Sequence, residues 1–392
     1  MLKRLSAEHG ILYSRGNDTL FGYFGWPTVV KLDERRLLVG ASGFRTQHID
    51  PFGKTVLFES LNAGRSWGEP VIVNDSPVDD RDVGLLNLGD GKVLVSWFSQ
   101  DTRIFAKPRP GFRKVGKKAD FSVRDQRFDI TPILESWDDA TVAANVGAFI
   151  RIRDAEGKWG RRIEAPASAP HGPVKLLDGR LFYAGTIPYK GRGDKPFFLR
   201  TVTSVSEDGG ETWSEPRPLP APPEERMDCE PHAIQLPSGR ILVHLRREPE
   251  FAIYQTYSDD AGLTWSEPEF LTVGAPPHLL RHSSGVLICS YGWRRQGYGQ
   301  RVLLSYDDGK SYESWIIRDD GFSGDLGYPS TVELEDGTLY TVYYQKTAPD
   351  ALNCSLLTSH WELPARGLET AEDISPARLE PCFFCNRSRS VL

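Results

Sequence analysis

Six stretches of the chain repeat one pattern of apolar and polar residues: an apolar strand, a tight polar turn and a second apolar strand. The first copy, residues 25–39, reads GWPTVVKLDERRLLV, and the fourth, residues 230–243, reads EPHAIQLPSGRILV. The copies begin near residues 25, 82, 171, 230, 276 and 327. Most of the turns contain Asp-Gly or Ser-Gly, and glycine between two apolar runs indicates a hairpin because it takes a positive φ without a steric penalty. The pattern predicts six β-hairpins.

A second repeat, Ser-x-Asp-x-Gly-x-Ser/Thr-aromatic, is interleaved with the first. The aspartate of such a segment accepts backbone N–H bonds, the glycine takes the left-handed conformation and the aromatic ring packs beneath, so each copy predicts a self-contained turn. The stretch after the second hairpin holds only a degenerate copy, Asp154–Trp159. The other copies are Ser206–Trp213, Ser258–Trp265, Ser305–Tyr312 and, with Asn62 in place of the aspartate, Ser60–Trp67.

One hairpin and one boxed turn make a four-stranded unit, and six such units predict an all-β fold, a six-bladed β-propeller. Residues 10–14 precede the first copy and are expected to close the ring as the outer strand of the last blade. We expect a single domain over residues 1–365 and a C-terminal tail over residues 366–392. An open β-solenoid is the alternative, although solenoid repeats are shorter.

The balance of charges narrows the range of partners. The chain has 47 Lys and Arg against 53 Asp and Glu, a formal net charge of −6. Nucleic acids and anionic membranes attract basic surfaces, so neither is an expected partner, whereas a small anionic ligand needs only a local basic pocket. The start of the sequence lacks the apolar stretch of a secretory signal and no run is long enough to span a membrane, so we expect a cytoplasmic protein. The sequence leaves the oligomeric state open.

The cysteines do not predict a disulfide framework, because there are five of them, sparsely placed. Cys382 and Cys385 form a Cys-x-x-Cys pair, but the second pair that would complete a zinc site is missing. We therefore expect neither a metal nor a cofactor.

The boxed turns resemble the Asp-box (BNR) repeats of sialidases, also called neuraminidases. More specific likenesses lie at the starts of the innermost strands, which open onto one face of the channel. Leu326–Thr331 resembles the family segment with the nucleophilic tyrosine, which implies that role for Tyr328. Asp228–His232 resembles the segment with the glutamate that activates this tyrosine, which implies Glu230.

The same resemblance implies a triad of arginines that binds the substrate carboxylate. The strand end His244–Arg246 resembles the one that presents the second arginine, which implies Arg246. The third arginine is expected from the loop over residues 293–301, where Arg295 and Arg301 are both candidates. The family opens blade one with Phe/Tyr-Arg-Ile-Pro, and this chain has Gly25 in place of that first arginine.

The loss at Gly25 leaves two possibilities open. Either Arg45, Lys54 or Arg81 supplies the missing charge from a neighbouring loop, or the substrate is not a sialic acid. The resemblance also implies an acid/base aspartate on a loop before the first box, which assigns Asp50.

A tyrosine nucleophile suits a substrate with a carboxylate at its anomeric carbon, because a neutral phenol approaches it without repulsion. The phenol of tyrosine has a pKa of about 10, so it needs an adjacent base, here Glu230. Asp50 would protonate the leaving oxygen and later activate water. The structural alternatives are a packed aromatic ring for Tyr328, a solvated acid for Glu230 and an ion pair with Glu250 for Arg246.

Three histidines, His171, His232 and His278, also open innermost strands. They either orient loops or bind sugar hydroxyls, and no His-x-His or Glu-x-x-His spacing supports a metal site.

The segment Asp79–Asp82 opens blade two, and its charged residues Asp80, Arg81 and Asp82 form either a clamp for substrate hydroxyls or a self-paired loop cluster. Trp26 is either a wall on which a sugar stacks or part of the packing between blades.

These features lead to three functional hypotheses. The first is a retaining, sialidase-like exo-glycoside hydrolase that releases a terminal acidic sugar, such as a sialic acid, from a glycan. The second is an exo-glycosidase of the same scaffold for a non-sialic sugar, which the loss at Gly25 favours. The third is a non-catalytic carbohydrate-binding propeller. Polar residues at all six strand starts favour an enzyme over a binding protein.

Overall fold

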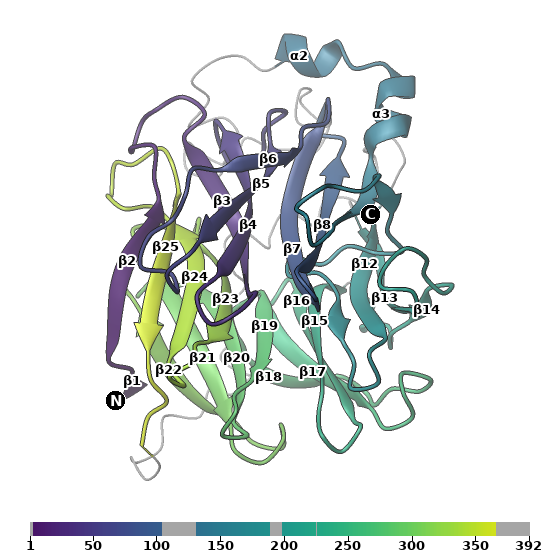
Figure 1. Cartoon of the computed structure of the whole chain (residues 1–392), viewed down its shortest axis with the longest axis vertical. Helices are drawn as coiled ribbons and strands as arrows, with labels where there is room; N and C mark the ends of the chain where they lie inside the picture. The colour runs from purple at the N-terminus through teal and green to yellow at the C-terminus, as the bar shows by residue number, and fades with distance from the viewer. Residues whose placement is uncertain (1–2, 104–130, 189–197, 225, 366–392) are drawn as a thin grey trace.

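In the computed structural model the chain forms six sheets arranged around a central axis, which confirms the predicted six-bladed β-propeller (Figure 1). The structure describes residues 3–103, 131–188, 198–224 and 226–365. Each blade is an antiparallel meander whose first strand is innermost, and the innermost strands of neighbouring blades contact each other around the axis.

The strands of each blade follow one another along the chain from the inner edge to the outer edge. Blade one contains β3 (Tyr23–Lys31), β4 (Leu37–Arg45), β5 (Lys54–Ser60) and β6 (Val71–Asn74). Blade two contains β7 (Asp79–Gly89), β8 (Lys92–Gln100), β9 (Gly147–Arg153) and β10 (Ile163–Glu164). Blade three contains β11 (Val174–Lys175), β12 (Leu181–Pro188), β13 (Phe198–Ser206) and β14 (Arg217–Pro218).

The second half of the ring repeats this order. Blade four contains β15 (Met227–Gln235), β16 (Ile241–Glu248), β17 (Ala252–Ser258) and β18 (Glu269–Val273). Blade five contains β19 (Pro277–Arg281), β20 (Leu287–Trp293), β21 (Gly299–Ser305) and β22 (Glu313–Arg318). Blade six contains β23 (Gly327–Glu333), β24 (Leu339–Gln345) and β25 (Ser355–Trp361).

The outer strand of blade six comes from the other end of the chain. Strand β2 (Ala7–Tyr13) pairs antiparallel with β25, so backbone hydrogen bonds hold the segment that precedes blade one in the sheet of blade six. Strand β1 (Lys3–Arg4) adds a short parallel pairing to β22 of blade five. The ring is therefore closed, which excludes the open solenoid.

The boxed turns form as their sequence predicts. In blade three the amide of Gly210 donates to Oγ of Ser206, and the amide of Thr212 donates to Oδ1 of Asp208. Gly210 has a φ of 101°. Asn62 preserves the turn of blade one because its side-chain oxygen accepts the amide of Ser66 in the same way.

Apolar side chains on alternate positions of each strand pack between neighbouring blades. One such cluster joins Val39 and Phe58 of blade one to Val342 of blade six, and all three side chains are fully buried. Two short helices, α2 (Thr131–Glu135) and α3 (Asp139–Asn145), belong to the long connection between β8 and β9.

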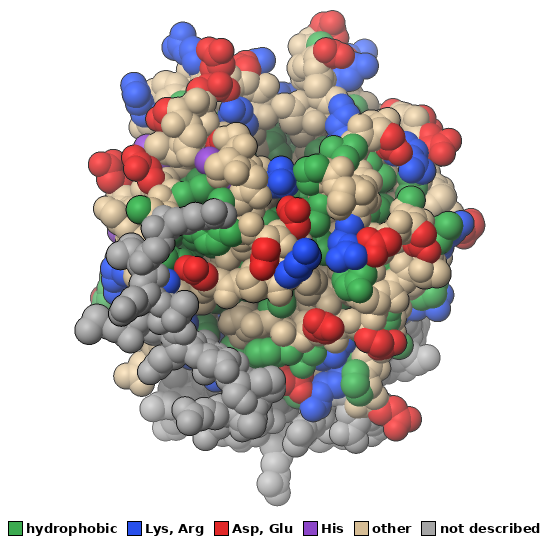
Figure 2. Space-filling model, turned by 90° about the horizontal axis from the view of Figure 1, so that it is seen from below, with side chains coloured by type: hydrophobic (Ala, Val, Ile, Leu, Met, Phe, Trp, Pro, Cys, Tyr) green, Lys and Arg blue, Asp and Glu red, His purple; other side chains and the backbone are tan. Residues whose placement is uncertain are grey.

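The antiparallel meander separates two ends of the propeller. The hairpin turns and the boxed turns lie at one end. The starts of the innermost strands and the loops between second and third strands lie at the other. Seen from below, acidic and basic side chains are interspersed over the surface without a large patch of one sign (Figure 2). Among the described residues, no helix is long and apolar enough to cross a membrane. The predicted tail at 366–392, with Cys382 and Cys385, lies outside the described residues.

Candidate active site

Four innermost strands carry the same local distortion at the open end of the propeller. In β3, β7, β15 and β23 the pairing register breaks at a residue with positive φ. These residues are Trp26 (54°), Asp82 (49°), Glu230 (49°) and Tyr328 (53°). A non-glycine residue in this region costs on the order of 1–3 kcal/mol, and such bulges commonly re-aim side chains near active sites. Four bulges at equivalent positions therefore mark this end as the candidate site.

Tyr328 and Glu230 meet directly across the mouth of the channel. The hydroxyl of Tyr328 donates to Oε1 of Glu230 over 2.5 Å, and Nη1 of Arg246 donates to Oε2 over 2.9 Å. Burial, and then the negative charge of Glu230, hold the pKa of Tyr328 well above its usual range. The phenol therefore keeps its proton in the resting site, and the adjacent carboxylate is placed to accept it.

Arg246 forms ion pairs with two carboxylates rather than one. Its Nε donates to Oε1 of Glu248 over 2.6 Å, and its Nη2 donates to the same oxygen. Its guanidinium lies over the ring of Phe251, with the central carbon 4.6 Å from the ring centroid. Part of its hydrogen-bonding capacity is therefore used within the protein before any ligand binds.

The loop after β20 brings an unexpected arginine to the site. Arg294, not Arg295 or Arg301, lies over Tyr328, with its central guanidinium carbon 5.7 Å from the ring centroid. Its Nε donates to the carbonyl of Leu326 over 3.0 Å. Arg301 instead lies on the third strand of the blade and stacks on Trp293 at 3.4 Å, while Arg295 is half-buried in the loop.

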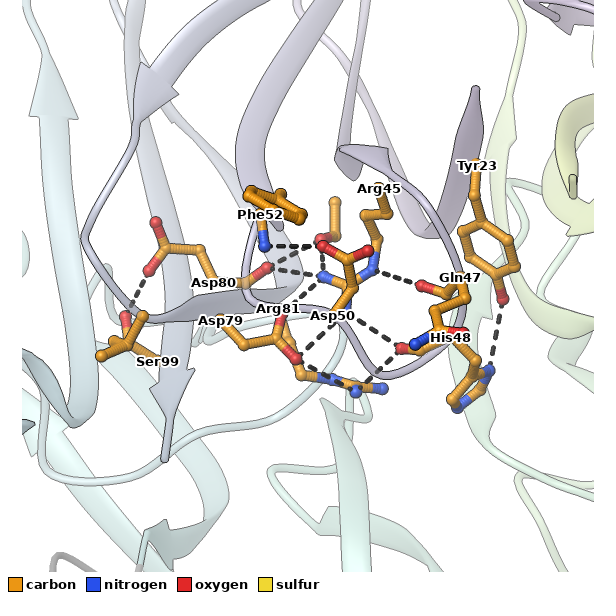
Figure 3. A network of polar contacts seen from close by, with 12 residues as sticks. Tyr23, Arg45, Gln47, His48, Asp50, Phe52, Asp79, Asp80, Arg81 and Ser99 are labelled. Carbon is orange, nitrogen blue, oxygen red and sulfur yellow. Dashed lines mark hydrogen bonds and ion pairs between the residues drawn. The ribbon is translucent and has the colours of Figure 1, made fainter. Parts of the chain in front are cut away.

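Arg45 is buried inside blade one and is a structural cation (Figure 3). It makes a bidentate ion pair with Asp79, over 2.7 and 3.1 Å, and donates to Ser42 and to the carbonyls of Gln47 and His48. The donors of Arg45 are directed at protein acceptors in this arrangement, so the geometry favours a structural role over the predicted substrate binding.

Of the three cations considered as replacements for the missing arginine, Arg45 and Arg81 both lie over the ring of the bulge residue Trp26, and the central guanidinium carbon of Arg45 is 4.8 Å from the ring centroid. Arg81 is the closer of the two. Its central guanidinium carbon is 4.3 Å from the ring centroid of Trp26, and its Nη1 donates to the carbonyl of His48. Lys54 pairs with Asp75 at 2.5 Å.

Gly25 leaves little room for a side chain. A Cβ on this residue would lie 3.3 Å from Cε1 of Tyr23 and 3.5 Å from Cδ2 of Tyr344. Trp26, the next residue, is 0% exposed and packs against both tyrosines. Of its two predicted roles, the structure supports packing, since a fully covered ring offers no face to a sugar.

Asp50 does not reach the channel mouth in this conformation. It is 0% exposed, and its carboxylate caps its own loop by accepting the amides of Thr46 and Phe52 over 2.7 and 2.6 Å (Figure 3). Burial raises its pKa. The predicted acid/base role requires an accessible carboxyl, so the geometry favours a structural role for Asp50 instead.

The two aspartates that flank Arg81 differ in how their carboxylate oxygens are hydrogen-bonded. Asp80 accepts hydrogen bonds from Ser99, Asn74 and both the amide and hydroxyl of Ser76, so it belongs to a self-paired cluster rather than a hydroxyl clamp. Burial raises its pKa to about 6. Asp82, by contrast, has a buried Oδ1 without a hydrogen-bond partner among the described residues.

The three predicted histidines cluster beneath the site. The ring centroids of His171, His232 and His278 lie 4.7–5.6 Å apart, and burial lowers the pKa of each well below its usual value. Nδ1 of His232 accepts the amide of Leu279, and Nδ1 of His278 accepts the amide of Thr331. In a neutral ring the proton then lies on Nε2, which cannot bind a metal. Among the described residues no group of three or more candidate ligands is placed to hold a metal ion.

A polar triad beside Trp26 was not predicted from the sequence. Nδ1 of His48 lies 2.9 Å from Oδ1 of Asp325, which also accepts the hydroxyl of Tyr23 over 2.9 Å. His48 lies 4.9 Å from Trp26, ring to ring. Arg294 and Glu248 were also missed. His48, Asp325 and Arg294 lie in loops, whereas Tyr23 and Glu248 lie at the ends of β3 and β16. The only available signal was that these residues flank predicted segments.

Comparisons with known proteins agree with this architecture. Residues 149–341 match the BNR repeat-like domain family. No curated protein matches the sequence. A protein of unknown function from Dyadobacter fermentans superposes with a TM-score of 0.70 at 20% identity, covering 91% of this chain and 98% of that one.

Two further solved structures are similar and have assigned activities. The NanB sialidase from Streptococcus pneumoniae superposes with a TM-score of 0.62 at 14% identity, covering 90% of this chain and 70% of that one. An α-L-arabinanase from Penicillium chrysogenum, complexed with arabinobiose, gives 0.59 at 13% identity, covering 91% and 98%. Identities this low establish the shared fold and leave the chemistry to the site itself.

Proposed function

Because this chain is a six-bladed BNR-repeat propeller of the sialidase-like kind, with a fold that glycoside hydrolases share, we propose that it is a retaining exo-glycoside hydrolase. It releases a terminal acidic sugar from a glycan. The observation that carries the proposal is the 2.5 Å hydrogen bond from Tyr328 to Glu230 at the open end of the channel.

In the first step the phenolic oxygen of Tyr328 attacks the anomeric carbon while its proton moves to Glu230. The bond from that carbon to the leaving oxygen breaks, and the leaving oxygen takes a proton from a general acid. In the second step water attacks the same carbon, releases the sugar and returns Tyr328 to its protonated form. The anomeric configuration is inverted twice and therefore retained.

The charges around this pair support an acidic substrate. Arg246, Arg294 and Arg81 surround Tyr328 and Trp26 at the open end. A guanidinium binds a carboxylate through paired, charge-assisted hydrogen bonds. Because Gly25 supplies none, and Tyr23 and Tyr344 crowd its position, we expect a sugar acid other than an ordinary sialoside, such as another ulosonic or a uronic sugar.

One observation favours a neutral substrate as the second candidate. Glu230 and Glu248 already accept hydrogen bonds from Arg246, so this arginine carries little uncompensated charge. In that case the enzyme is an exo-glycosidase for a non-sialic sugar. A non-catalytic binding role fits less well, because strained backbone at four equivalent positions is costly to maintain for binding alone.

A panel of aryl glycosides tests the proposal, with neutral, uronic and ulosonic sugars as separate arms. Wild type is compared with Tyr328→Phe, and with Tyr257→Phe as a matched control in blade four, away from the site. We expect hydrolysis of at least one acidic glycoside by wild type and the control, and its loss in Tyr328→Phe. Hydrolysis of neutral glycosides alone would support the second candidate.

A further inference from the structure

Asp82 occupies a position equivalent to those of the catalytic pair. It lies at the register break of β7, as Glu230 does in β15 and Tyr328 in β23, and the three φ angles agree within a few degrees at 49°, 49° and 53°. The bulges turn the side chains of blades two, four and six toward the same end of the axis.

The electrostatic surroundings of Asp82 place it close to this axis. Burial is the main cause of the raised pKa of Tyr183 in blade three, of Tyr328 in blade six and of Asp82 itself. The charge of Asp82 adds to the first two shifts, and the charge of Glu230 in blade four adds to the third. A residue of blade two influences these three blades together only from near the centre of the ring. The other charged groups around it are Arg81, Arg45 and Asp79.

Asp82 is also the aspartate of this region whose carboxylate oxygens do not both have hydrogen-bond partners within the protein. Asp50, Asp79 and Asp80 each accept hydrogen bonds at both oxygens. The Asp82 side chain is nearly covered, with the residue 5% exposed, yet its Oδ1 has no partner among the described residues. A buried carboxyl oxygen without a hydrogen-bond donor is energetically unfavourable. A proton on the carboxyl group, or a ligand that contacts it, would explain such an oxygen.

We propose that Asp82 is the general acid and base of the glycosidase, the role that the sequence assigned to Asp50. The proposal rests on the proposed function and names the group that its first step requires. Glu230 is unsuited to the role, because it receives the proton of Tyr328 and is held by Arg246.

With Asp82 as the general acid and base, every proton that moves in the two steps is accounted for. Its carboxyl proton moves to the glycosidic oxygen as the bond to the anomeric carbon breaks and the bond from Tyr328 forms, while the phenolic proton moves to Glu230. Asp82 then takes a proton from the attacking water, and Glu230 returns its proton to Tyr328. Burial raises the pKa of Asp82 to about 7, with Arg81 opposing and Glu230 adding to the shift, so both protonation states are accessible near neutral pH.

The test compares leaving groups. Asp82→Asn, Asp50→Asn and Asp90→Asn are assayed on a dinitrophenyl and an alkyl glycoside of the sugar that wild type hydrolyses best. Asp90 is the matched control, since it also has a positive φ (50°) but lies in the turn that follows β7, at the end of the strand opposite to Asp82. Circular dichroism and thermal unfolding establish that each variant folds.

For Asp82→Asn we expect a loss of about 10²–10⁴-fold on the alkyl glycoside, which needs protonation, and a much smaller loss on the dinitrophenyl glycoside. Asp82→Ala should regain turnover of the activated substrate when azide is added, with a glycosyl azide as product. Asp50→Asn and Asp90→Asn should show no dependence on the leaving group.

Equal losses on both substrates for Asp82→Asn, or leaving-group dependence in Asp50→Asn, would overturn the assignment of Asp82 while leaving the hydrolase intact. If wild type hydrolyses none of the glycosides, the proposed function fails, and the role of Asp82 fails with it.

Discussion

The hydroxyl of Tyr328 donates a 2.5 Å hydrogen bond to Oε1 of Glu230, although 98 positions separate the two residues in the sequence. Blade six supplies the phenol and blade four the carboxylate, and both side chains are directed inward by the same kind of bulge. The contact is that of a weak nucleophile next to the base that activates it.

Tyr328→Phe removes the attacking oxygen and keeps the ring, and Glu230→Gln removes the base. We expect each to lower kcat by at least about 10³-fold, on the scale of losing a catalytic group. Steady-state kinetics on the best glycoside measure this. The double variant should lose little more than either single one, because the two residues act as a unit. Additive losses would show that they act independently.

Arg246→Met should destabilise the fold more than Arg294→Met. Arg246 compensates Glu230 and Glu248, and breaking a buried ion pair by removing one partner costs about 3–5 kcal/mol. Arg294 donates to a carbonyl and a phenol, so its loss leaves no uncompensated charge on these partners. Urea unfolding compares the two. Arg246→Met/Glu248→Gln should recover part of the loss, and equal unfolding free energies for the single variants would contradict this interpretation.

Arg294→Met should act on substrate affinity. If the substrate is acidic, we expect KM to rise by roughly 10-fold or more, as for the loss of a charge-assisted hydrogen bond. A neutral glycoside should be little affected. The measurement is the ratio of the KM changes on matched uronic and neutral substrates. Equal changes would show that Arg294 does not recognise the negative charge of the substrate.

Asp82→Asn should change how stability depends on pH. The pKa of Asp82 in the folded protein, about 7, lies above its usual value. Between about pH 4 and pH 7 the folded state therefore holds a proton that the unfolded state has released, and the stability of the wild type falls as pH rises through this window. The asparagine variant lacks this loss. The difference in Tm, variant minus wild type, should therefore increase across this window and level off above it. A difference that does not vary with pH would show that Asp82 titrates normally.

Ordinary sialosides should be poor substrates of the wild type. Gly25→Arg restores the arginine of the resembled family, but the new Cβ lies within 3.3–3.6 Å of Tyr23 and Tyr344, so we expect lower stability and no gain in sialidase activity. An aryl sialoside assay and thermal unfolding measure both effects. Robust cleavage by the wild type would mean that Arg81 carries the missing charge.

The repeats made the fold predictable because they are local. Each boxed turn is satisfied within a few residues, as Ser206 and Asp208 illustrate, so its sequence alone predicts its structure. Tyr328 and Glu230 were singled out by the resemblance of their segments to those of sialidases. Both lie at bulges near the starts of innermost strands, and the ring brings these strand starts to the same end of the propeller.

The rest of the site depends on contacts between segments that have no fixed register. Arg294 lies one residue past β20, where strand alternation no longer decides which neighbouring side chain faces inward. The carboxylate of Asp50 is captured by Thr46 and Phe52 of its own loop. His48 faces Asp325, a residue from the far end of the chain, and no local pattern links them.

The pairing of β2 with β25 has a consequence for how the protein is made. On the ribosome β2 is synthesised before the other strands of blade six, and its partner β25 is the last of the described strands to be synthesised. Throughout translation β2 has no partner for its backbone groups, and an unpaired strand is a template for association with other chains. Nascent chains should therefore be most prone to aggregate just before β25 leaves the exit tunnel. A circular permutant that joins β25 directly to β2 would turn this distant pairing into a hairpin, and should reach the native state with less need of chaperones.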